Sequence, residues 1–266
     1  MWKYVREMTP IALASTWQPR GEFSRLARLA ATLKERYAGV YIVLPPKAEQ
    51  ALVETIEEDL GLNAVRAEDW THGKHIALRQ ALNSDATHVH YCDLDRLLYW
   101  AEAYGEELRQ TLNVLTVTDV LVMGRSEAAW GTHPQAMRLT EQMFNEVFSH
   151  LLGQPMDIGA SSRGFSRRVA EFLVQHSTPG RAVGVDSEWL VLAHRAGFGI
   201  DYVAVDGLGW ETPDQYKEDM IADVDLRLKM AADADTQWNF WLQRAKIGQQ
   251  IIEAGLAALQ MPIGVR

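Results

Sequence analysis

Two aspartates, Asp93 and Asp95, directly follow an apolar run that ends at Cys92. Side chains two residues apart on an extended backbone point the same way, so the two carboxylates are expected to converge. Carboxylate oxygens hold hard divalent cations such as Mg²⁺ and Mn²⁺, and a bound cation can in turn hold a diphosphate. The pair therefore predicts a metal-assisted nucleotide site, with capping of a following helix as the simpler alternative.

Three basic residues lie near the same predicted edge and are candidates for binding phosphate. Gly73-Lys74 precedes a predicted helix, so Lys74 and Arg79 could reach a phosphate while the helix N-terminus adds a favourable dipole. The alternative for Lys74 is a solvated side chain at a helix start. Arg125 follows the next strand along the chain, and its planar guanidinium matches the geometry of phosphate oxygens.

Two acids at the start of a later predicted helix, Asp186 and Glu188, are candidates for a general base. Such a base takes the proton from an acceptor hydroxyl as the hydroxyl attacks a sugar carbon. Either acid could instead serve as a helix cap or as a partner of the helix dipole. Trp210, after the next strand, offers an apolar face for a sugar or a base, although packing is the simpler role for one of nine tryptophans.

Short apolar runs alternate with amphipathic segments through the first hundred residues, which predicts βαβαβα units in a mostly parallel sheet. Residues 88–92 are the predicted fourth strand and 119–123 the fifth, with one helix over 99–112 between them. The segment 158–164 is predicted to be a turn between two helices. Ligands of open parallel sheets lie at the carboxyl ends of the strands, which is where Asp93 and Asp95 fall.

The length of 266 residues suits one large α/β domain, predicted over residues 1–222. Residues 223–266 are predicted to form a C-terminal helical extension. An apolar stripe that includes Trp238, Ile247 and Ile251 indicates that this extension packs on the domain or forms a homodimer contact.

The net charge of −9 argues against nucleic acid as a partner and requires local groups or a metal to hold any phosphate. The single cysteine, Cys92, excludes an internal disulfide and suits a reducing cytoplasm. The charged N-terminus does not resemble a signal peptide, and no apolar segment is long enough to span a bilayer. We therefore expect a cytoplasmic protein without a transmembrane segment.

The ordered segments from Gly73 to Val205 resemble the inverting family of GT-A glycosyltransferases, particularly the catalytic part of dolichyl-phosphate mannose synthase and its relatives. The resemblance is carried by Gly73-Lys74, Asp93-Leu-Asp95, Asp119 to Ser126, Arg138 and Asn145, Gly153, Asp157, Ser162 to Arg167, and Asp186-Ser-Glu188. It implies a GT-A-like fold, a three-layer α/β/α arrangement with a mostly parallel central sheet.

The resemblance also implies roles for these residues. Asp93 would face the ribose or the metal, and Asp95 would ligate a Mg²⁺ or Mn²⁺ ion that bridges the diphosphate. Arg125 and Arg138 would lie toward the transferred group or an acceptor phosphate. Arg163, within the Ser162 to Arg167 segment, is a further candidate for substrate binding, and Asp186 or Glu188 becomes the base.

The expected function is transfer of a sugar, with inversion, from a nucleoside-diphosphate donor to the hydroxyl of a soluble acceptor. One departure from the family bears on the donor: Val43 to Lys47 stand where the family usually has acids that read the nucleotide base. The donor nucleotide therefore stays open.

Three other kinds of protein use similar motifs. A nucleotidyltransferase normally carries a glycine-rich, basic signature after the first strand, whereas Ser15 to Gly21 holds only Arg20 and Gly21 of that kind. A glycosyltransferase-like protein that binds a saccharide without turnover remains an alternative. A phosphatase with the same Asp-x-Asp motif needs threonine where Leu97 stands, so it is set aside.

Overall fold

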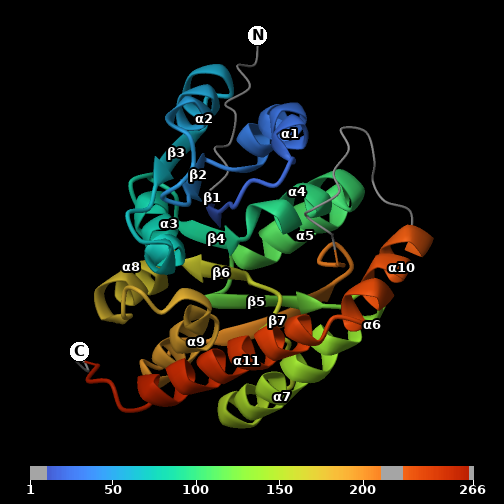
Figure 1. Cartoon of the computed structure of the whole chain (residues 1–266). Helices are drawn as coiled ribbons and strands as arrows, with labels where there is room; N and C mark the ends of the chain where they lie inside the picture. The colour runs from blue at the N-terminus through green and yellow to red at the C-terminus, as the bar shows by residue number, and fades with distance from the viewer. Residues whose placement is uncertain (1–10, 211–223, 264–266) are drawn as a thin grey trace.

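A seven-stranded β-sheet forms the centre of the computed structural model, which describes residues 11–210 and 224–263 (Figure 1). The strands are β1 (Ile11–Thr16), β2 (Gly39–Leu44), β3 (Asn63–Arg66), β4 (His88–Cys92), β5 (Val120–Arg125), β6 (Ser162–Ser166) and β7 (Ile200–Val205). Their order in the sheet is β3-β2-β1-β4-β6-β5-β7, and β6 runs antiparallel to both of its neighbours. The other pairs are parallel, which confirms the predicted mostly parallel sheet.

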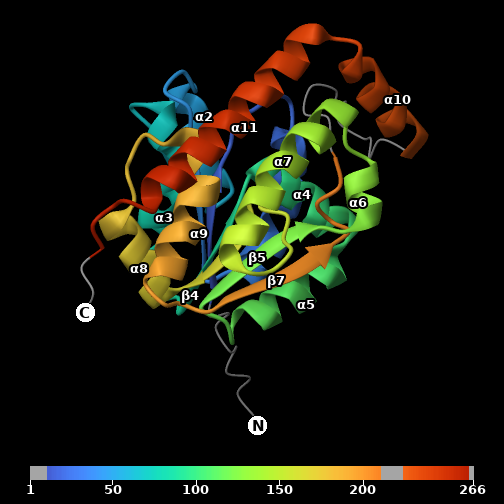
Figure 2. The ribbon, with the colours of Figure 1, turned by 90° about the horizontal axis from the view of Figure 1, so that it is seen from below.

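Helices on both faces of the sheet complete the predicted three-layer arrangement (Figures 1 and 2). One face is covered by α1 (Phe23–Arg36), α4 (Leu94–Ala103) and α5 (Gly105–Leu115). The other is covered by α3 (Gly73–Ala81), α7 (Gln135–Leu152), α8 (Arg167–His176) and α9 (Val185–Arg195). Shorter elements are α2 (Gln50–Glu54), η1 (Thr55–Asp59), η2 (Trp70–His72), α6 (Glu127–Gly131) and η3 (Ala182–Gly184).

Strand β1 shows why the sheet needs a helical layer on each side. Its side chains alternate between the faces, so Ile11 and Leu13 join one apolar core while Ala12 and Ala14 join the other. All four are at most 1% exposed. Full burial of a side chain such as Leu13 contributes about 2 kcal/mol relative to leaving it in water, so both cores stabilise the same strand.

The segment predicted as a turn between helices instead contains the antiparallel strand β6. Ser162 lies opposite Cys92 and Ser166 opposite His88, so the start of β6 meets the carboxyl end of β4. Gly164 permits this pairing, because a Cβ there would come within 2.2 Å of the Leu115 side chain. The antiparallel direction has a consequence for the site, since it places the loop before β6 at the edge where Asp93 lies.

The helix predicted over residues 99–112 is in fact two helices, α4 and α5. They meet at Tyr104, whose backbone angles of φ −133° and ψ 42° are not helical. The earlier start of α4, at Leu94, puts Asp95 in its first turn. Both acids of the motif are therefore fixed by the junction of β4 with α4.

The chain closes with α10 (Val224–Asp235) and α11 (Trp238–Ala258), as predicted. Helix α11 lies across α7 and α9 (Figure 2). Ser187 donates a hydrogen bond to the Ile251 carbonyl at 2.5 Å, and Arg195 donates one to the Ala258 carbonyl at 2.6 Å. The predicted domain boundary at residue 222 lies outside the described residues.

The apolar stripe predicted along the last helix does not form one buried face. Ile251 is 2% exposed, whereas Trp238 is 84% exposed.

Across residues 11–210 and 224–263, no helix has both the length and the apolar character needed to cross a membrane.

Candidate active site

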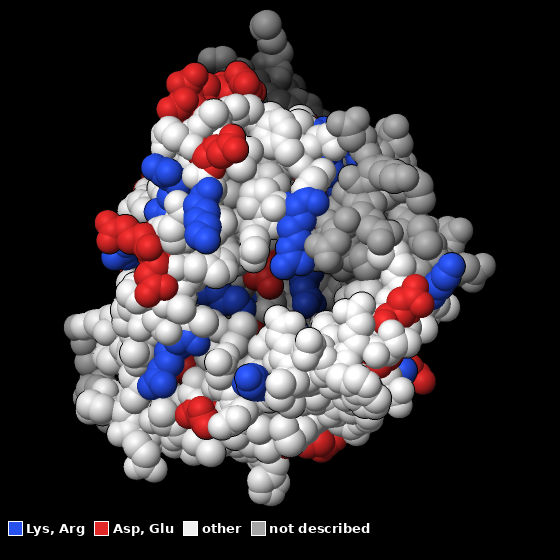
Figure 3. Space-filling model, in the orientation of Figure 1, with Lys and Arg blue, Asp and Glu red and all other residues white. Residues whose placement is uncertain are grey.

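A pocket of about 270 Å³ opens at the carboxyl ends of β1 and β4. Figure 3 shows a hollow in this face with basic side chains around it and acidic atoms at its base. The charged residues that line the pocket are Arg20, Lys74, Asp93, Asp95, Arg96, Asp186 and Arg244. The pocket therefore has four basic and three acidic side chains, although the whole chain carries a net charge of −9. This local excess of positive charge favours binding of a phosphate.

Asp93 occupies the residue before α4, but its side chain makes no capping hydrogen bond to that helix. Its Oδ1 instead accepts hydrogen bonds from the hydroxyls of Tyr91, at 2.7 Å, and Thr16, at 3.1 Å. The carboxylate is therefore oriented from the strand side and lines the pocket. This geometry favours the ligand-binding interpretation of the motif over the helix-capping alternative.

Asp95 lies one residue into α4 and also lines the pocket. Burial, followed by the negative charge of Asp93, raises the pKa of its carboxyl to about 6. A carboxyl whose ionisation is opposed by a neighbouring carboxylate fits a divalent cation, which would relieve the repulsion. Among the residues that the structure describes, no three His, Cys, Asp or Glu side chains gather into a metal cluster. Oxygens of a diphosphate and of water would therefore have to complete the coordination.

Lys74 and Asp186 meet at the pocket wall. The Lys74 Nζ lies 2.9 Å from Asp186 Oδ1 and donates a hydrogen bond to the Ser161 hydroxyl at 3.0 Å. Arg163 Nη1 lies 3.0 Å from the same Oδ1. Burial by itself raises the pKa of Asp186, but the charges of Lys74 and Arg163 outweigh burial and hold that pKa below its usual value. Asp186 is therefore an ionised carboxylate in the pocket.

Ser161 adopts a backbone φ of 51°, in the left-handed region that residues other than glycine seldom occupy. Its hydroxyl donates to Asp186 Oδ2 at 3.2 Å. The loop before β6 thus takes a strained conformation at the point where it contacts both Lys74 and Asp186.

Glu188 does not share the position of Asp186, which corrects the expectation that either acid could serve as the base. Residues two apart on a helix point to nearly opposite sides, and Glu188 is fully buried away from the pocket lining. Its Oε1 accepts a hydrogen bond from the Thr178 backbone N–H at 3.3 Å and lies 3.4 Å from Arg181 Nε. Burial raises the pKa of this carboxyl.

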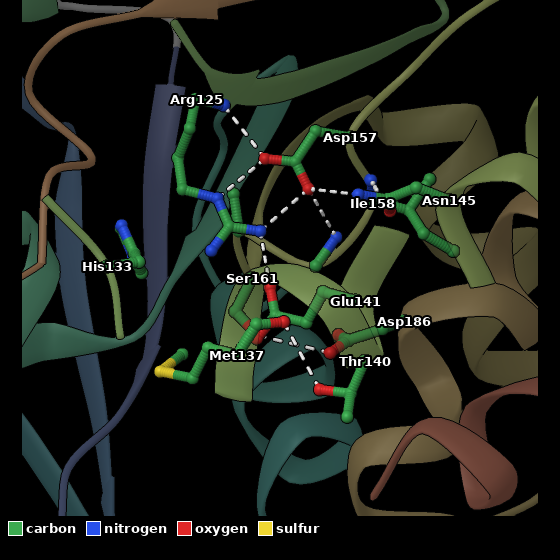
Figure 4. A network of polar contacts seen from close by, with 12 residues as sticks. Arg125, His133, Met137, Thr140, Glu141, Asn145, Asp157, Ile158, Ser161 and Asp186 are labelled. Carbon is green, nitrogen blue, oxygen red and sulfur yellow. Dashed lines mark hydrogen bonds and ion pairs between the residues drawn. The ribbon is translucent and has the colours of Figure 1, made fainter. Parts of the chain in front are cut away.

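Arg125 is also placed differently from the prediction. It is the last residue of β5, and its side chain turns into the protein, where it has no exposed surface (Figure 4). Arg125 Nε and Nη2 contact the two Asp157 carboxylate oxygens at 2.7 and 2.8 Å, and Nη2 also contacts Glu141 Oε2 at 2.5 Å. Arg125 is thus fully buried and does not line the pocket, so it is not placed to bind a phosphate there.

The contacts of Arg125 nevertheless serve the pocket, because they hold the loop that lines it. Asn145 donates to Asp157 Oδ1 at 2.9 Å and accepts from the Ile158 backbone N–H at 2.9 Å (Figure 4). A Cβ at Gly159 would come within 2.6 Å of Glu141, so the loop can approach this network only with glycine. The network therefore fixes the backbone that leads to Ser161.

Four other predicted residues lie outside the pocket lining. Arg163 is 1% exposed, and it donates hydrogen bonds to the carboxylate and to the backbone oxygen of Asp186. It therefore orients Asp186 and does not contact the pocket itself. Arg79 is exposed near the end of α3 and does not line the pocket. Arg138 is half-buried in the first turn of α7, and Trp210 is half-buried with its backbone N–H donating to Thr132 at 2.7 Å.

The structure adds pocket residues that the sequence did not single out: Thr16, Gln18, Trp70, Arg96 and Arg244. Arg96 directly follows Asp95, and Trp70 lies four residues before Lys74, so proximity to the motifs was a signal for these two. Arg244 had no such signal, because it belongs to a helix that reads as an apolar stripe.

No protein-family model matches this chain, and no curated protein does. Solved structures match it: glucosyl-3-phosphoglycerate synthase from Mycobacterium tuberculosis in complex with UDP has a TM-score of 0.56 and 13% identity. The match covers 96% of this chain and 81% of that one. Complexes of that synthase with Mn²⁺, UDP-glucose and either phosphoglyceric acid or glycerol 3-phosphate each match with a TM-score of 0.55, 13% identity and the same coverage. The chain therefore has the fold of a GT-A nucleotide-sugar glycosyltransferase.

Proposed function

We propose that this protein is a glycosyltransferase that moves a sugar from a nucleoside-diphosphate donor to the hydroxyl of a small soluble acceptor, with Mg²⁺ or Mn²⁺ as cofactor. The observation that carries the proposal is the place of Asp93 and Asp95, which line one pocket with Lys74 at the carboxyl end of β4. The shared fold supports it, because the neighbour was solved with UDP-glucose and Mn²⁺ in complex.

In this proposal Asp93 and Asp95 would hold the cation, which would supply positive charge against the charge that builds on the departing diphosphate. Lys74 contributes a second positive charge, and Asp186 holds its ammonium at the pocket wall. Arg96 is anchored by a hydrogen bond from Nη1 to the Ala160 carbonyl at 3.2 Å. Fixed charges of this kind favour a transition state without the cost of reorienting solvent.

The donor we propose first is UDP-glucose, because the structural neighbour was solved with it. Strand β2 ends in the fully buried Val43 and Leu44, so it presents no acid to read a base. Gln18 and Trp70 line the pocket. In our proposal these two residues bind the nucleotide base, which stacks against the Trp70 ring. Trp70→Ala is expected to weaken UDP binding by about tenfold, the scale of one lost stacking contact; unchanged affinity would remove Trp70 from the base site.

Asp186 is the base that we propose for an inverting transfer, because the order of motifs resembles that of dolichyl-phosphate mannose synthase. The acceptor oxygen forms a bond to the sugar carbon, the bond from that carbon to the diphosphate oxygen breaks, and the acceptor proton passes to Asp186. Lys74 and Arg163 keep the carboxylate ionised, as the step requires. The anomeric configuration of the product, measured by NMR, tests this part: retention would contradict it.

The function itself is tested by incubating the protein with UDP-glucose, Mn²⁺ and phosphoglyceric acid or glycerol 3-phosphate. Mass spectrometry is expected to detect UDP and a glucosylated acceptor. Release of pyrophosphate would indicate a nucleotidyltransferase instead. Donor binding without any product would support the non-catalytic alternative.

A further inference from the structure

Helix α11 contributes a charged residue, Arg244, to the pocket. Its side chain is 18% exposed, and its Nη2 lies 2.5 Å from Glu141 Oε1. Glu141 is 1% exposed, and its other oxygen, Oε2, lies 2.5 Å from Arg125 Nη2. A buried carboxylate thus bridges two arginines, one from the end of strand β5 and one from the C-terminal helix.

This ion network leaves hydrogen-bonding capacity on Arg244. Its Nε is buried and has no hydrogen-bond partner among the residues that the structure describes. A buried N–H of this kind costs free energy unless a partner is supplied. Burial lowers the pKa of Arg244, and the charges of Arg96 and Arg125 lower it further against the opposing effect of Glu141. An anion in the pocket would stabilise the charged form of this guanidinium.

Arg244 lies on a wall of the pocket that is formed by other elements than those that carry Asp93 and Asp95. Asp93 and Asp95 come from the junction of β4 with α4, whereas Phe144, Ile247 and Ile251 beside Arg244 come from α7 and α11. That wall is apolar apart from the guanidinium. It suits a small molecule with an apolar part and one anionic group.

We infer that Arg244 binds the anionic group, a carboxylate or a phosphate, of the acceptor, and that Glu141 is a positioning residue that orients Arg244. The inference rests on the proposed function, because it assigns the acceptor side of that same pocket. Glu141 fixes one nitrogen of the guanidinium, so the remaining N–H groups are directed without loss of side-chain freedom on binding.

The first test is calorimetric titration of the full chain with glycerol 3-phosphate, glycerate and uncharged glycerol, each with and without UDP and Mn²⁺. Arg244→Gln is compared with Lys246→Gln, which removes an exposed charge two residues away on the same helix. We expect Arg244→Gln to weaken binding of at least one anion by about tenfold to a hundredfold, the scale of a lost charge-assisted hydrogen bond. Lys246→Gln should leave that affinity unchanged.

These titrations test the role of Arg244 separately from the proposed function. Whichever anion depends on Arg244 identifies the group as phosphate or carboxylate. Equal anion affinity in wild type and Arg244→Gln, or loss of UDP binding to the same extent as anion binding, would overturn the inference. Failure of wild type to bind UDP with Mn²⁺ would count against the proposed function, and the titrations without nucleotide would still decide the role of Arg244.

A second test addresses Glu141 through steady-state kinetics. Glu141→Gln keeps the size of the side chain but removes the charge that holds Arg244, so the acceptor KM should rise about tenfold while the donor KM stays constant. Glu141→Asp, which keeps the charge, should recover part of the loss. Equal changes in both KM values would show a purely structural role and overturn the positioning assignment. If Glu141→Gln does not fold, Glu141→Asp and Arg244→Lys replace it in the same comparison.

Discussion

The Lys74 ammonium lies 2.9 Å from Asp186 Oδ1, so the start of α3 is tied to the start of α9 at the pocket. Arg163 and Ser161 also contact Asp186, so both oxygens of its carboxylate have partners. The pair gives the pocket a fixed positive group beside a fixed negative one. Several consequences of this arrangement can be measured.

Lys74→Gln should lower kcat/KM for the nucleotide sugar by about a hundredfold or more, because it removes a fixed charge that faces the diphosphate. Asp186 keeps Arg163 as a partner, so the protein should still fold. Arg79→Gln is the matched control, because Arg79 is exposed on the same helix and outside the pocket. Steady-state kinetics check both variants, and a similar loss in the control would remove the assignment.

Asp186→Asn should lower turnover by about a hundredfold to ten-thousandfold, the contribution of a general base. Glu188→Gln should leave turnover close to that of wild type, because Glu188 is buried away from the pocket. Rapid-quench measurement of product formation distinguishes the two. Full activity of Asp186→Asn would exclude its role as the base.

Arg125→Met should reduce the free energy of unfolding by about 3–5 kcal/mol, because it leaves Asp157 and Glu141 buried without their shared partner. Arg168→Gln removes an ion pair to Asp119 whose arginine is 72% exposed, and the expected cost is about 0–1 kcal/mol. Urea unfolding followed by circular dichroism measures both. Equal losses would show that burial of the Arg125 network does not matter for stability.

Acidification should destabilise the protein partly through His90, which is fully buried between Tyr37 and Ser162. Burial lowers the pKa of His90 to about 3, whereas an unfolded histidine has a pKa of about 6.5. The unfolded state therefore binds the proton first, and the stability present above pH 6.5 is lost as the pH falls toward 3. At pH 5 the loss is about 2 kcal/mol.

His90→Gln removes this titration, so the free energies of unfolding of the two proteins should converge between pH 6.5 and pH 4. Urea unfolding at each pH supplies the comparison. Parallel pH profiles would mean that His90 is not held neutral in the folded protein.

The order of strands and helices around the metal motif was predictable because its signals are local. The run before Asp93 is apolar, and a parallel sheet follows from the alternation of short runs with amphipathic segments. Strand β6 was not predictable, because Ser162-Arg-Gly-Phe-Ser166 lacks β-branched residues and becomes a strand only through pairing with β4 and β5.

The candidate site could be predicted where the motif fixes the backbone, and not where tertiary packing decides the direction of a side chain. Asp93, Asp95, Lys74 and Asp186 line the pocket as the ends of strands and helices suggested. Arg125 was misplaced because β5 extends as far as this residue and turns the side chain inward. Arg244 depends on how α11 crosses α7, which its own apolar spacing does not encode.

The most direct test of the account is calorimetric titration of UDP-glucose into the full chain with Mn²⁺ and with a chelator, for wild type and for Asp95→Asn. Wild type is expected to bind the nucleotide sugar with Mn²⁺ and to lose at least tenfold in affinity with the chelator, while Asp95→Asn should bind weakly in both conditions. Equal affinity of wild type with and without Mn²⁺, or no effect of Asp95→Asn, would contradict a metal-assisted nucleotide-sugar site at Asp93 and Asp95.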